Sequence, residues 1–213
     1  MARITKDPQV RMAEILDTAE EMFYAKGYHE TQISDIVKKI GVAQGTFYYY
    51  FKSKEEILEA LINRQVKQIS FELEKLTSDT SLDPLRKMER FFETILNTIR
   101  YKDGLLFEFL YNDRYLHLLD KLTRLGEEFI SPFLLRIIAE GQEKEVFHVS
   151  HPEVAEAFIG NIINCMFDAI YKKLPTELYV QYVEMAEALI EKTLGLPAHS
   201  QKKSPGVLAL FRL

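Results

Sequence analysis

Cysteine is nearly absent from this sequence, because Cys165 is the only one among 213 residues. A single cysteine cannot form an intramolecular disulfide, and it excludes a zinc site built from several cysteines. Glycine and proline are also scarce, at 9 and 7 residues, which argues against an all-β fold with many short turns. The 32 acidic residues outnumber the 27 basic ones, so the net charge of −5 gives no general sign of nucleic-acid binding. A nucleic-acid site would therefore have to depend on local charge.

Long apolar runs are missing as well. The first 30 residues carry charges throughout and contain no stretch that resembles a signal peptide. The least polar segment, residues 157–171, is interrupted by Asn161, Asn164 and Asp168, and we expect it to be too short to span a bilayer. The sequence therefore predicts a cytoplasmic protein with no membrane partner.

Apolar residues recur at the three- and four-residue spacing of helices along most of the chain, and no convincing strand is visible. In the first third we predict four helices. The first runs from Asp7-Pro8 to Gly27, and Tyr28 is expected to fold back on Phe23 as in a Schellman ending. The second runs from a Thr31 cap to Gly41, the third from Gln44 to Phe51, and a long fourth helix is capped by Ser53 and ends near Leu76. After a polar linker at residues 77–83 we predict helices near 84–101, 104–112, 113–142, 152–173 and 176–194. Pro132 is expected to kink or split the longest of these.

The segment 31–54 (TQISDIVKKIGVAQGTFYYYFKSK) has the pattern of a helix-turn-helix, two short helices joined by a turn at residues 41–43. The second helix of such a unit presents its N-terminal residues to base edges in the major groove, and here these are Ala43, Gln44, Gly45 and Thr46. The Gln44 amide can pair bidentately with adenine, and Gly45 lets the backbone approach closely. Phe47 and Phe51 can anchor the inner face, which leaves Tyr48, Tyr49 and Tyr50 outside, where their hydroxyls can reach phosphates.

Local charge supports the same interpretation. Between Asp35 and Glu55 the sequence has no acidic residue and four lysines: Lys38, Lys39, Lys52 and Lys54. A positive patch of this kind would make DNA binding depend on salt. The alternative is that the tyrosines are half-buried aromatic residues and the lysines form a solvated face. The capped short helix, the Gly41 turn, the small residues and the acid-free window occur together, and their combination favours DNA binding.

At this point the sequence resembles a known family. The motifs Lys26-Gly27-Tyr28, Thr31-x-Ile33-x-x-Ile36, Gly41-Val42 and GTFYYYFKSK (residues 45–54) are similar to the N-terminal domain of the TetR family of bacterial transcriptional regulators. The resemblance covers roughly residues 9–69. It implies an all-α fold with a three-helix helix-turn-helix DNA-binding domain at 9–69 (helix-turn-helix about 32–51) and a larger C-terminal helical effector-binding and dimerisation domain at 82–195. Residues 196–213 then form a tail whose role stays open.

The resemblance also implies roles for individual residues. Gln44, Gly45 and Tyr48 occupy positions that commonly face bases in the family, and Ser34 lies where some members place a base-reading side chain. The phosphate-binding positions correspond to Thr31, Thr46, Tyr49, Tyr50 and Lys54. Tyr50 departs from a frequent histidine, but its hydroxyl can still donate to a phosphate. The implied function is a sequence-specific regulator, a homodimeric repressor released from a pseudo-palindromic double-stranded operator by a small, largely hydrophobic effector.

Helix-turn-helix proteins usually bind DNA as dimers, because one recognition helix makes few base contacts. The family resemblance places the dimer interface in the last two helices, here about residues 152–194. The first of them has small residues that permit close packing: Ala155, Ala157 and Gly160. The second has a row of mainly apolar residues at helical spacing: Leu178, Tyr182, Met185, Ala186 and Leu189. The alternative is that these positions belong to the core of a single chain.

The C-terminal half is rich in aromatic residues, which suits an apolar effector pocket with a few polar groups. The candidate effector-binding residues are Phe107, Tyr111, Phe129, Phe133, Asn161, Asn164, Phe167 and Asp168. Asn161, Asn164 and Asp168 share one helix face and could orient a ligand, with Asp168 meeting a cationic group. Two alternatives stay open: the aromatic residues are packed core, or the polar line forms hydrogen bonds across the dimer.

Other chemistry finds less support. The histidines do not have metal-site spacing; His148 and His151 lie in an expected loop with Glu153 as the neighbouring carboxylate, so we expect no metal. Cys165 has no obvious partner base and is interpreted as a buried, inert thiol. No Gly-rich phosphate loop or G-x-S-x-G motif occurs, so we expect neither a cofactor nor an enzyme. A helical adaptor that kept the scaffold without binding DNA is the third possibility, and the acid-free window argues against it.

Overall fold

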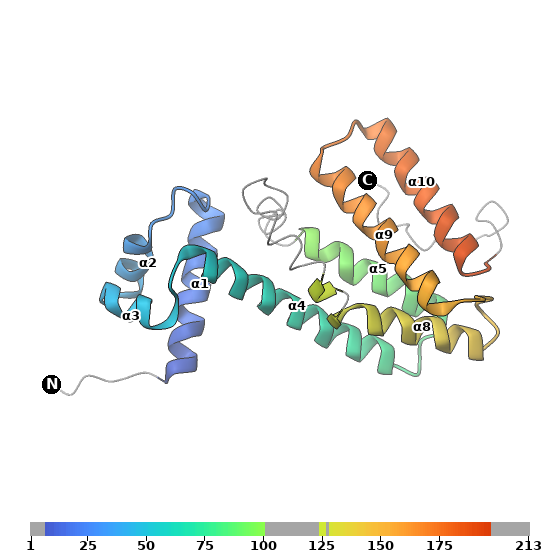
Figure 1. The fold of residues 1–213 in the computed structure, drawn as a ribbon, viewed down its shortest axis with the longest axis horizontal. Coiled ribbons are helices and arrows are strands. Elements are labelled where there is room, and N and C mark those ends of the chain that lie inside the picture. The colour runs from blue at the N-terminus through green and yellow to red at the C-terminus, as the bar shows by residue number, and fades with distance from the viewer. Residues whose placement is uncertain (1–6, 101–123, 127, 197–213) are drawn as a thin grey trace. The chain divides into compact units, whose positions relative to one another are not determined.

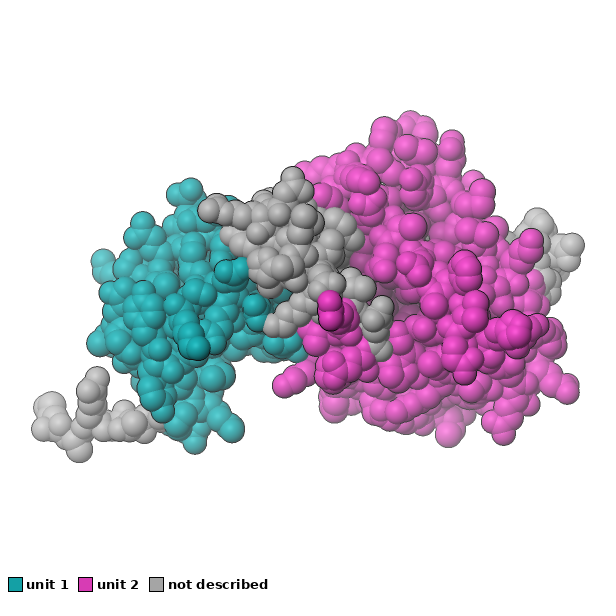
Figure 2. Space-filling model, in the orientation of Figure 1, with its two compact units in different colours: residues 1–65 teal, residues 66–213 magenta. Residues whose placement is uncertain are grey.

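The computed structural model describes residues 7–100, 124–126 and 128–196 (Figure 1). All regular secondary structure in these ranges is helical, which confirms the all-α fold class. The chain divides into two compact units, residues 1–65 (unit 1) and 66–213 (unit 2), shown in different colours in Figure 2. The division falls inside one long helix, α4, which runs from Lys54 to Ser78.

Unit 1 begins with α1 (Pro8–Lys26), whose two ends follow the local signals in the sequence. The Asp7 carboxylate accepts a 2.8 Å hydrogen bond from the backbone N–H of Gln9, as an N-cap does. Gly27 ends the helix with φ 85°, but its ψ of 152° is not left-handed helical, so the predicted Schellman ending is wrong. The Tyr28 ring nevertheless packs against Phe23, with ring centroids 4.9 Å apart, as predicted.

The helix-turn-helix consists of α2 (Ile33–Ile40) and α3 (Gln44–Tyr50). Gly41 between them is left-handed, with φ 76° and ψ 34°, and its N–H donates to Lys38 O while the N–H of Val42 donates to Val37 O. A residue with a Cβ is strained in this conformation, so the sequence needs glycine at position 41. In the described residues α1 packs against α2 and α2 against α3.

Thr31 does not cap α2 as the sequence suggested. The N-cap residue is Gln32, and the Thr31 side chain is fully buried. Its hydroxyl donates to the carbonyl oxygens of Gly27 (2.8 Å) and Met22 (3.2 Å), which ties the turn before α2 back to the end of α1. Ser53 does cap α4 as predicted, because its hydroxyl accepts a 3.2 Å hydrogen bond from the N–H of Glu56.

Unit 2 is a bundle of helices around one apolar core. Its described helices are the second part of α4, α5 (Pro84–Arg100), α8 (Ser131–Glu143), α9 (Pro152–Tyr171) and α10 (Thr176–Thr193). The packing pairs are α5 with α8, α8 with α9, and α9 with α10, which lie side by side in Figure 1. Phe147 reaches the core because residue 141 is glycine: a Cβ there would lie 1.9 Å from the Phe147 ring. Pro132 stands in the first turn of α8 and separates it from the preceding residues, so it splits the predicted long segment.

Helix α9 lies close to the bounds that the sequence predicts for it, 152–173. It has 20 residues with a mean hydropathy of 1.2 in its most apolar window, so it is the one helix in the described ranges that could cross a bilayer by length and composition. The segment 157–171, expected to be too short to span a bilayer, is only part of this helix. Its inner residues, such as Ile159 and Met166, are buried in the core of unit 2. A core helix satisfies the same length and composition test, so α9 is weak support for a membrane span.

Candidate nucleic-acid interface

Helix α3 has a buried face and an exposed face, as its aromatic pattern predicts. Phe47 is fully buried and Phe51, directly after the helix, is 3% exposed, and their ring centroids lie 6.1 Å apart. Tyr48 and Tyr49 lie on the other side and are 50% and 78% exposed. Single exposed aromatic residues are ordinary, but adjacent ones can mark an interaction surface. The phenylalanines therefore fix the helix while the tyrosines stay available.

The N-terminal end of α3 is also open to solvent. Gln44 and Gly45 are exposed, and the helix begins after Ala43 without a side-chain cap. A Cβ built on Gly45 would meet no atom within 4 Å, and its φ is not in the left-handed region. The fold of the described residues therefore does not need glycine at position 45. Absence of a side chain here instead leaves room for another molecule to approach the backbone.

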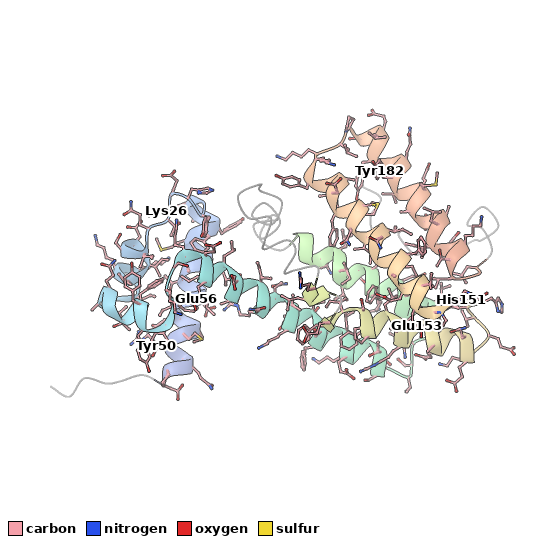
Figure 3. All side chains as sticks on the ribbon, in the orientation of Figure 1. Lys26, Tyr50, Glu56, His151, Glu153 and Tyr182 are labelled. Carbon is pink, nitrogen blue, oxygen red and sulfur yellow. The ribbon has the colours of Figure 1, made fainter. Side chains whose placement is uncertain are left out.

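The remaining predicted residues on this side are partly accessible. Figure 3 shows Tyr50 at the end of α3; it is half-buried, and its ring packs edge-on against Tyr49 at 4.9 Å between centroids. Thr46 is half-buried. Ser34, in the first turn of α2, is exposed and its hydroxyl donates to the side-chain oxygen of Gln32 at 3.3 Å. These hydroxyls can reorient toward a phosphate without breaking the core.

Two predicted phosphate-binding residues are placed otherwise by the structure. The hydroxyl of Thr31 is buried and already donates to two carbonyl oxygens, so its side chain is not available to a phosphate. Lys54, the first residue of α4, donates from Nζ to the carbonyl oxygens of Tyr28 and Thr31, both at 2.7 Å. Burial lowers the pKa of the Lys54 ammonium, and the nearby Glu30 carboxylate raises it by less. Sequence reasoning missed the Lys54 contacts because the partners lie 23 or more residues apart.

The acid-free window in the sequence is not an acid-free surface. Glu21 of α1 forms an ion pair with Lys39 at 2.7 Å, and Lys26 pairs with Asp35 at 3.5 Å. Folding thus brings one acidic residue of α1, Glu21, next to a lysine of α2, whereas the second pair joins a lysine of α1 to an acidic residue of α2. Within the described residues, only Lys38 and Lys52 of the four lysines of the window have neither an ion pair nor a side-chain hydrogen bond. The exposed face of α3 therefore supports DNA binding more strongly than the local charge does.

Comparisons with known proteins match the part of the chain that forms this surface to a family. The family model described as bacterial regulatory proteins of the tetR family matches residues 15–61, from within α1 to within α4. The uncharacterized HTH-type transcriptional regulator YdgC of Bacillus subtilis (strain 168) is 30% identical over 161 residues, which cover 70% of this chain and 75% of that protein. The chain belongs to the TetR family. The relatives that it matches are helix-turn-helix transcriptional regulators, and the matches indicate no catalytic family.

Other TetR relatives share mainly the N-terminal part. The fatty acid metabolism regulator protein of Bacillus subtilis (strain 168) is 40% identical over 70 residues, or 33% of this chain and 36% of that regulator. The chain spans less than half the length of several such curated relatives. The structure of the regulator FadR from Bacillus subtilis in complex with stearoyl-CoA superposes with a TM-score of 0.61 at 23% identity, over 84% of this chain and 97% of that one. This likeness shows that the fold extends through unit 2.

The expected dimer residues of this TetR protein divide into two groups. Ala155 and Ala186 are buried inside unit 2, so they belong to the core of the single chain. The other predicted residues of α10 are exposed, and Met185 is 63% exposed; these residues are Leu178, Tyr182, Met185 and Leu189. On α9, Ala157 is exposed and Gly160 half-buried. Sequence reasoning did not include Val154 and Phe158 on α9 among the expected dimer residues. They are 52% and 63% exposed and are spaced by one helical turn.

Of the predicted effector residues that the structure describes, some lie in or against the core of unit 2 and others are exposed. Phe107 and Tyr111 lie outside the described residues. Phe133 is buried in the core, Phe167 is half-buried against it, and Phe129 is 38% exposed. This arrangement favours the packed-core alternative for Phe133 and Phe167.

The polar line on α9 faces outward. Asn161 is exposed and its amide donates to the carbonyl oxygen of Ala157 at 2.8 Å, and Asn164 is exposed too. The Asp168 carboxylate accepts a 2.6 Å hydrogen bond from Lys172, one turn further along the helix. That bond raises the pKa of Lys172. Asp168 therefore already has a cationic partner, and the three residues lie on the same side of α9 as its exposed apolar residues.

Cys165 and the histidines complete the comparison with the sequence. Cys165 is exposed on α9, so its interpretation as a buried thiol is wrong. Figure 3 shows His151 and Glu153 where α9 begins, but the described residues contain no group of three or more His, Cys, Asp or Glu side chains that could hold a metal ion.

Proposed function

We propose that this TetR-family protein is a homodimeric repressor that binds operator DNA through the exposed face of α3 and leaves it when a small, largely hydrophobic effector binds. The observation that carries the proposal is the division of α3 into a buried phenylalanine face and an open face with Gln44, Gly45, Tyr48 and Tyr49. In a helix-turn-helix the second helix enters the major groove, and an exposed amide at its first turn is suited to adenine.

DNA binding is tested by fluorescence anisotropy with genomic fragments selected by the ligand-free protein. We expect the logarithm of the binding constant to fall linearly with the logarithm of the salt concentration, by about 0.9 per phosphate contacted. Tyr49→Phe is the matched variant, because it removes only a hydroxyl from a side chain that is 78% exposed. It should weaken binding and leave thermal stability unchanged. Absence of any salt-dependent binding by the wild-type protein would contradict the proposal.

The dimer is proposed to form through the outer faces of α9 and α10. Val154 and Phe158 on α9 and Leu178, Met185 and Leu189 on α10 are all at least 40% exposed in the single chain. Clustered exposed apolar side chains mark interaction surfaces, and a two-fold axis lets the same patch serve both protomers. The polar α9 residues Asn161 and Asn164 would then lie at or beside this interface, as the alternative in the sequence analysis allowed.

Met185→Glu tests the interface. We expect the wild-type protein to sediment as a dimer of the 24.8 kDa chain at micromolar concentration and the variant to shift toward the monomer, because a buried unpaired carboxylate is costly. Glu184→Lys is the control, since Glu184 is exposed on α10 but points about 100° away from Met185. A wild-type monomer at this concentration would refute the dimer.

Coupling between effector and DNA is proposed to pass through α4. This helix is continuous from Lys54 to Ser78 and contributes Leu58 and Leu61 to the core of unit 1 and Ile69 and Leu73 to the core of unit 2. A ligand that favours one arrangement of unit 2 can therefore change the spacing of the two recognition helices in the dimer.

The effector class is proposed from the apolar character of unit 2 and from the solved complex of FadR with stearoyl-CoA. Stearoyl-CoA and shorter acyl-CoA compounds are the first probes, with free coenzyme A as the control. An effector should raise the melting temperature, because ligand at 100 times its Kd stabilises the folded state by about 2.7 kcal/mol. It should also release DNA. Compounds that stabilise the protein without changing DNA affinity would contradict the coupling.

A further inference from the structure

One ammonium group holds together a turn far from it in the sequence. The Lys54 Nζ atom donates to the carbonyl oxygens of Tyr28 and Thr31, both at 2.7 Å, and it lies 3.4 Å from that of His29. It also lies 4.5 Å from the centroid of the Tyr28 ring, where a cation is attracted by the face of the aromatic system. A lysine ammonium has three donors and no acceptor, so the three carbonyl oxygens can occupy all of its donors.

The turn that Lys54 holds is also tied by other hydrogen bonds. Residues 27–32 connect α1 with α2 and lie outside both helices. The N–H of Thr31 donates to Tyr28 O at 3.3 Å, and Gln32 O accepts from the N–H groups of Asp35 and Ile36. The Thr31 hydroxyl ties the turn to Gly27 and Met22 from the inside, and the Tyr28 ring packs on Phe23. Lys54 supplies the donors for the carbonyl oxygens of Tyr28 and Thr31 from the other side.

Thr31 and Lys54 also lie at the two ends of the helix-turn-helix segment. Thr31 directly precedes Gln32, the N-cap residue of α2, and Lys54 is the first residue of α4. The bond from Lys54 to Thr31 thus joins the two ends of residues 32–53, which contain α2, the Gly41 turn and α3. Closing a loop removes conformations that the chain would otherwise sample.

We propose that Lys54 is a positioning residue that fixes the orientation of the helix-turn-helix by clasping its two ends, and that it does not bind a phosphate. This inference rests on the proposed DNA-binding function. The two 2.7 Å bonds use two of the three ammonium donors and the third lies 3.4 Å from the carbonyl oxygen of His29, so an ammonium that bound a phosphate would have to give up at least one of these contacts.

The first test uses Lys54→Met in the DNA-free protein and measures amide hydrogen exchange. The methionine keeps an apolar stem of similar length and removes all three donors. We expect faster exchange across residues 32–53 and in the preceding turn, with unchanged exchange in the core of unit 2. Lys67→Met is the matched control, because Lys67 is an exposed lysine on the same helix. It should exchange like the wild type, and equal exchange in Lys54→Met would overturn the inference.

The second test separates a clasp from a phosphate ligand. Anisotropy titrations over a range of salt should show about tenfold weaker DNA binding for Lys54→Met, the loss typical of a charged hydrogen bond, with the same salt slope as the wild type. If Lys54 bound a phosphate, its replacement by methionine would instead reduce the salt slope by about 0.9. Titration at high DNA concentration gives the fraction of protein able to bind, so that misfolded protein is not mistaken for weak binding.

The outcomes distinguish the two proposals. A slope reduced by about 0.9 with wild-type exchange makes Lys54 a phosphate ligand and overturns the inference. If Lys54→Met does not fold, Lys54→Gln, which keeps two amide donors, undergoes the same two measurements. If the wild-type protein binds no DNA, the proposed function fails, and the exchange comparison alone decides whether Lys54 holds the ends of the segment together.

Discussion

A buried ion pair in unit 2 allows a stability prediction that is independent of DNA. The Lys87 side chain of α5 is only 2% exposed, and its ammonium donates to the Glu140 carboxylate of α8 at 2.7 Å and to the carbonyl oxygen of Thr77 at 2.9 Å. The other Glu140 oxygen accepts from Lys144 at 2.7 Å. Lys87 therefore links the end of α4, α5 and α8, and its replacement by methionine should loosen all three.

The expected cost follows from what the substitution leaves behind. Removing one partner of a buried pair typically costs about 3–5 kcal/mol, because the other charge stays behind uncompensated. Glu140 is 23% exposed and keeps Lys144, so the lower end applies and we expect about 3 kcal/mol for Lys87→Met. The double variant with Glu140→Gln leaves no buried charge at this place and should lose less than Lys87→Met alone.

Urea unfolding at a fixed protein concentration measures this loss, and the four proteins of the double-mutant cycle give the interaction energy. A loss below about 1 kcal/mol for Lys87→Met, or a double variant less stable than both single ones, would refute the reasoning. Either result would mean that the Lys87 ammonium is solvated in the folded protein.

The same pair predicts how stability depends on pH. Burial alone would raise the pKa of Glu140, but the hydrogen bonds from Lys144 and Lys87 outweigh it and hold the pKa below the ordinary 4.5. A carboxyl whose pKa is lowered by folding stabilises the protein fully above its unfolded pKa, and this contribution disappears as the pH falls through the lowered value. The stability difference between Glu140→Gln and the wild type should therefore shrink as the pH falls below 4.5. A difference that grows on acidification would contradict this sign.

Two further predictions separate folding from DNA binding in unit 1. Phe47→Ala should lose about 3–4 kcal/mol in urea unfolding because Phe47 is fully buried, whereas Tyr49→Ala should stay within about 0.5 kcal/mol and instead weaken DNA binding in anisotropy. Equal stability losses would mean that α3 is oriented differently. Gly41→Ala should destabilise by about 1–2 kcal/mol because its φ is 76°, whereas Gly45→Ala should cost no stability and should weaken DNA binding by keeping the backbone away from the duplex. Unchanged DNA affinity of Gly45→Ala would show that the duplex does not approach that residue.

Helix limits in unit 1 were predictable because their signals are local. Asp7 and Ser53 each accept a hydrogen bond from an N–H two or three residues away, and Gly41 supplies a left-handed residue exactly between two helices. The side of α3 that carries Phe47 follows from helical periodicity alone. Such features need no knowledge of the rest of the chain.

Contacts between distant residues escaped sequence reasoning for the opposite reason. Thr31 looked like a helix cap, but the carbonyl oxygen of Met22, nine residues earlier, takes part in binding its hydroxyl. Lys39 looked like part of an acid-free patch, but Glu21 reaches it from α1. Cys165 lies in an apolar segment, yet it is on the exposed side of α9, because a helix of such composition can leave one apolar side uncovered.

The most direct measurement is a coupling experiment between Gln44 and the operator. Wild-type protein and Gln44→Ala are titrated against the selected operator and against versions with each base pair of one half-site replaced in turn. If α3 enters the major groove, replacing one A·T pair should weaken DNA binding by the wild type by about 1–3 kcal/mol and should not change binding by Gln44→Ala. The salt slope should be the same for both proteins. If Gln44→Ala binds every version as the wild type does, Gln44 does not read a base, which contradicts the account.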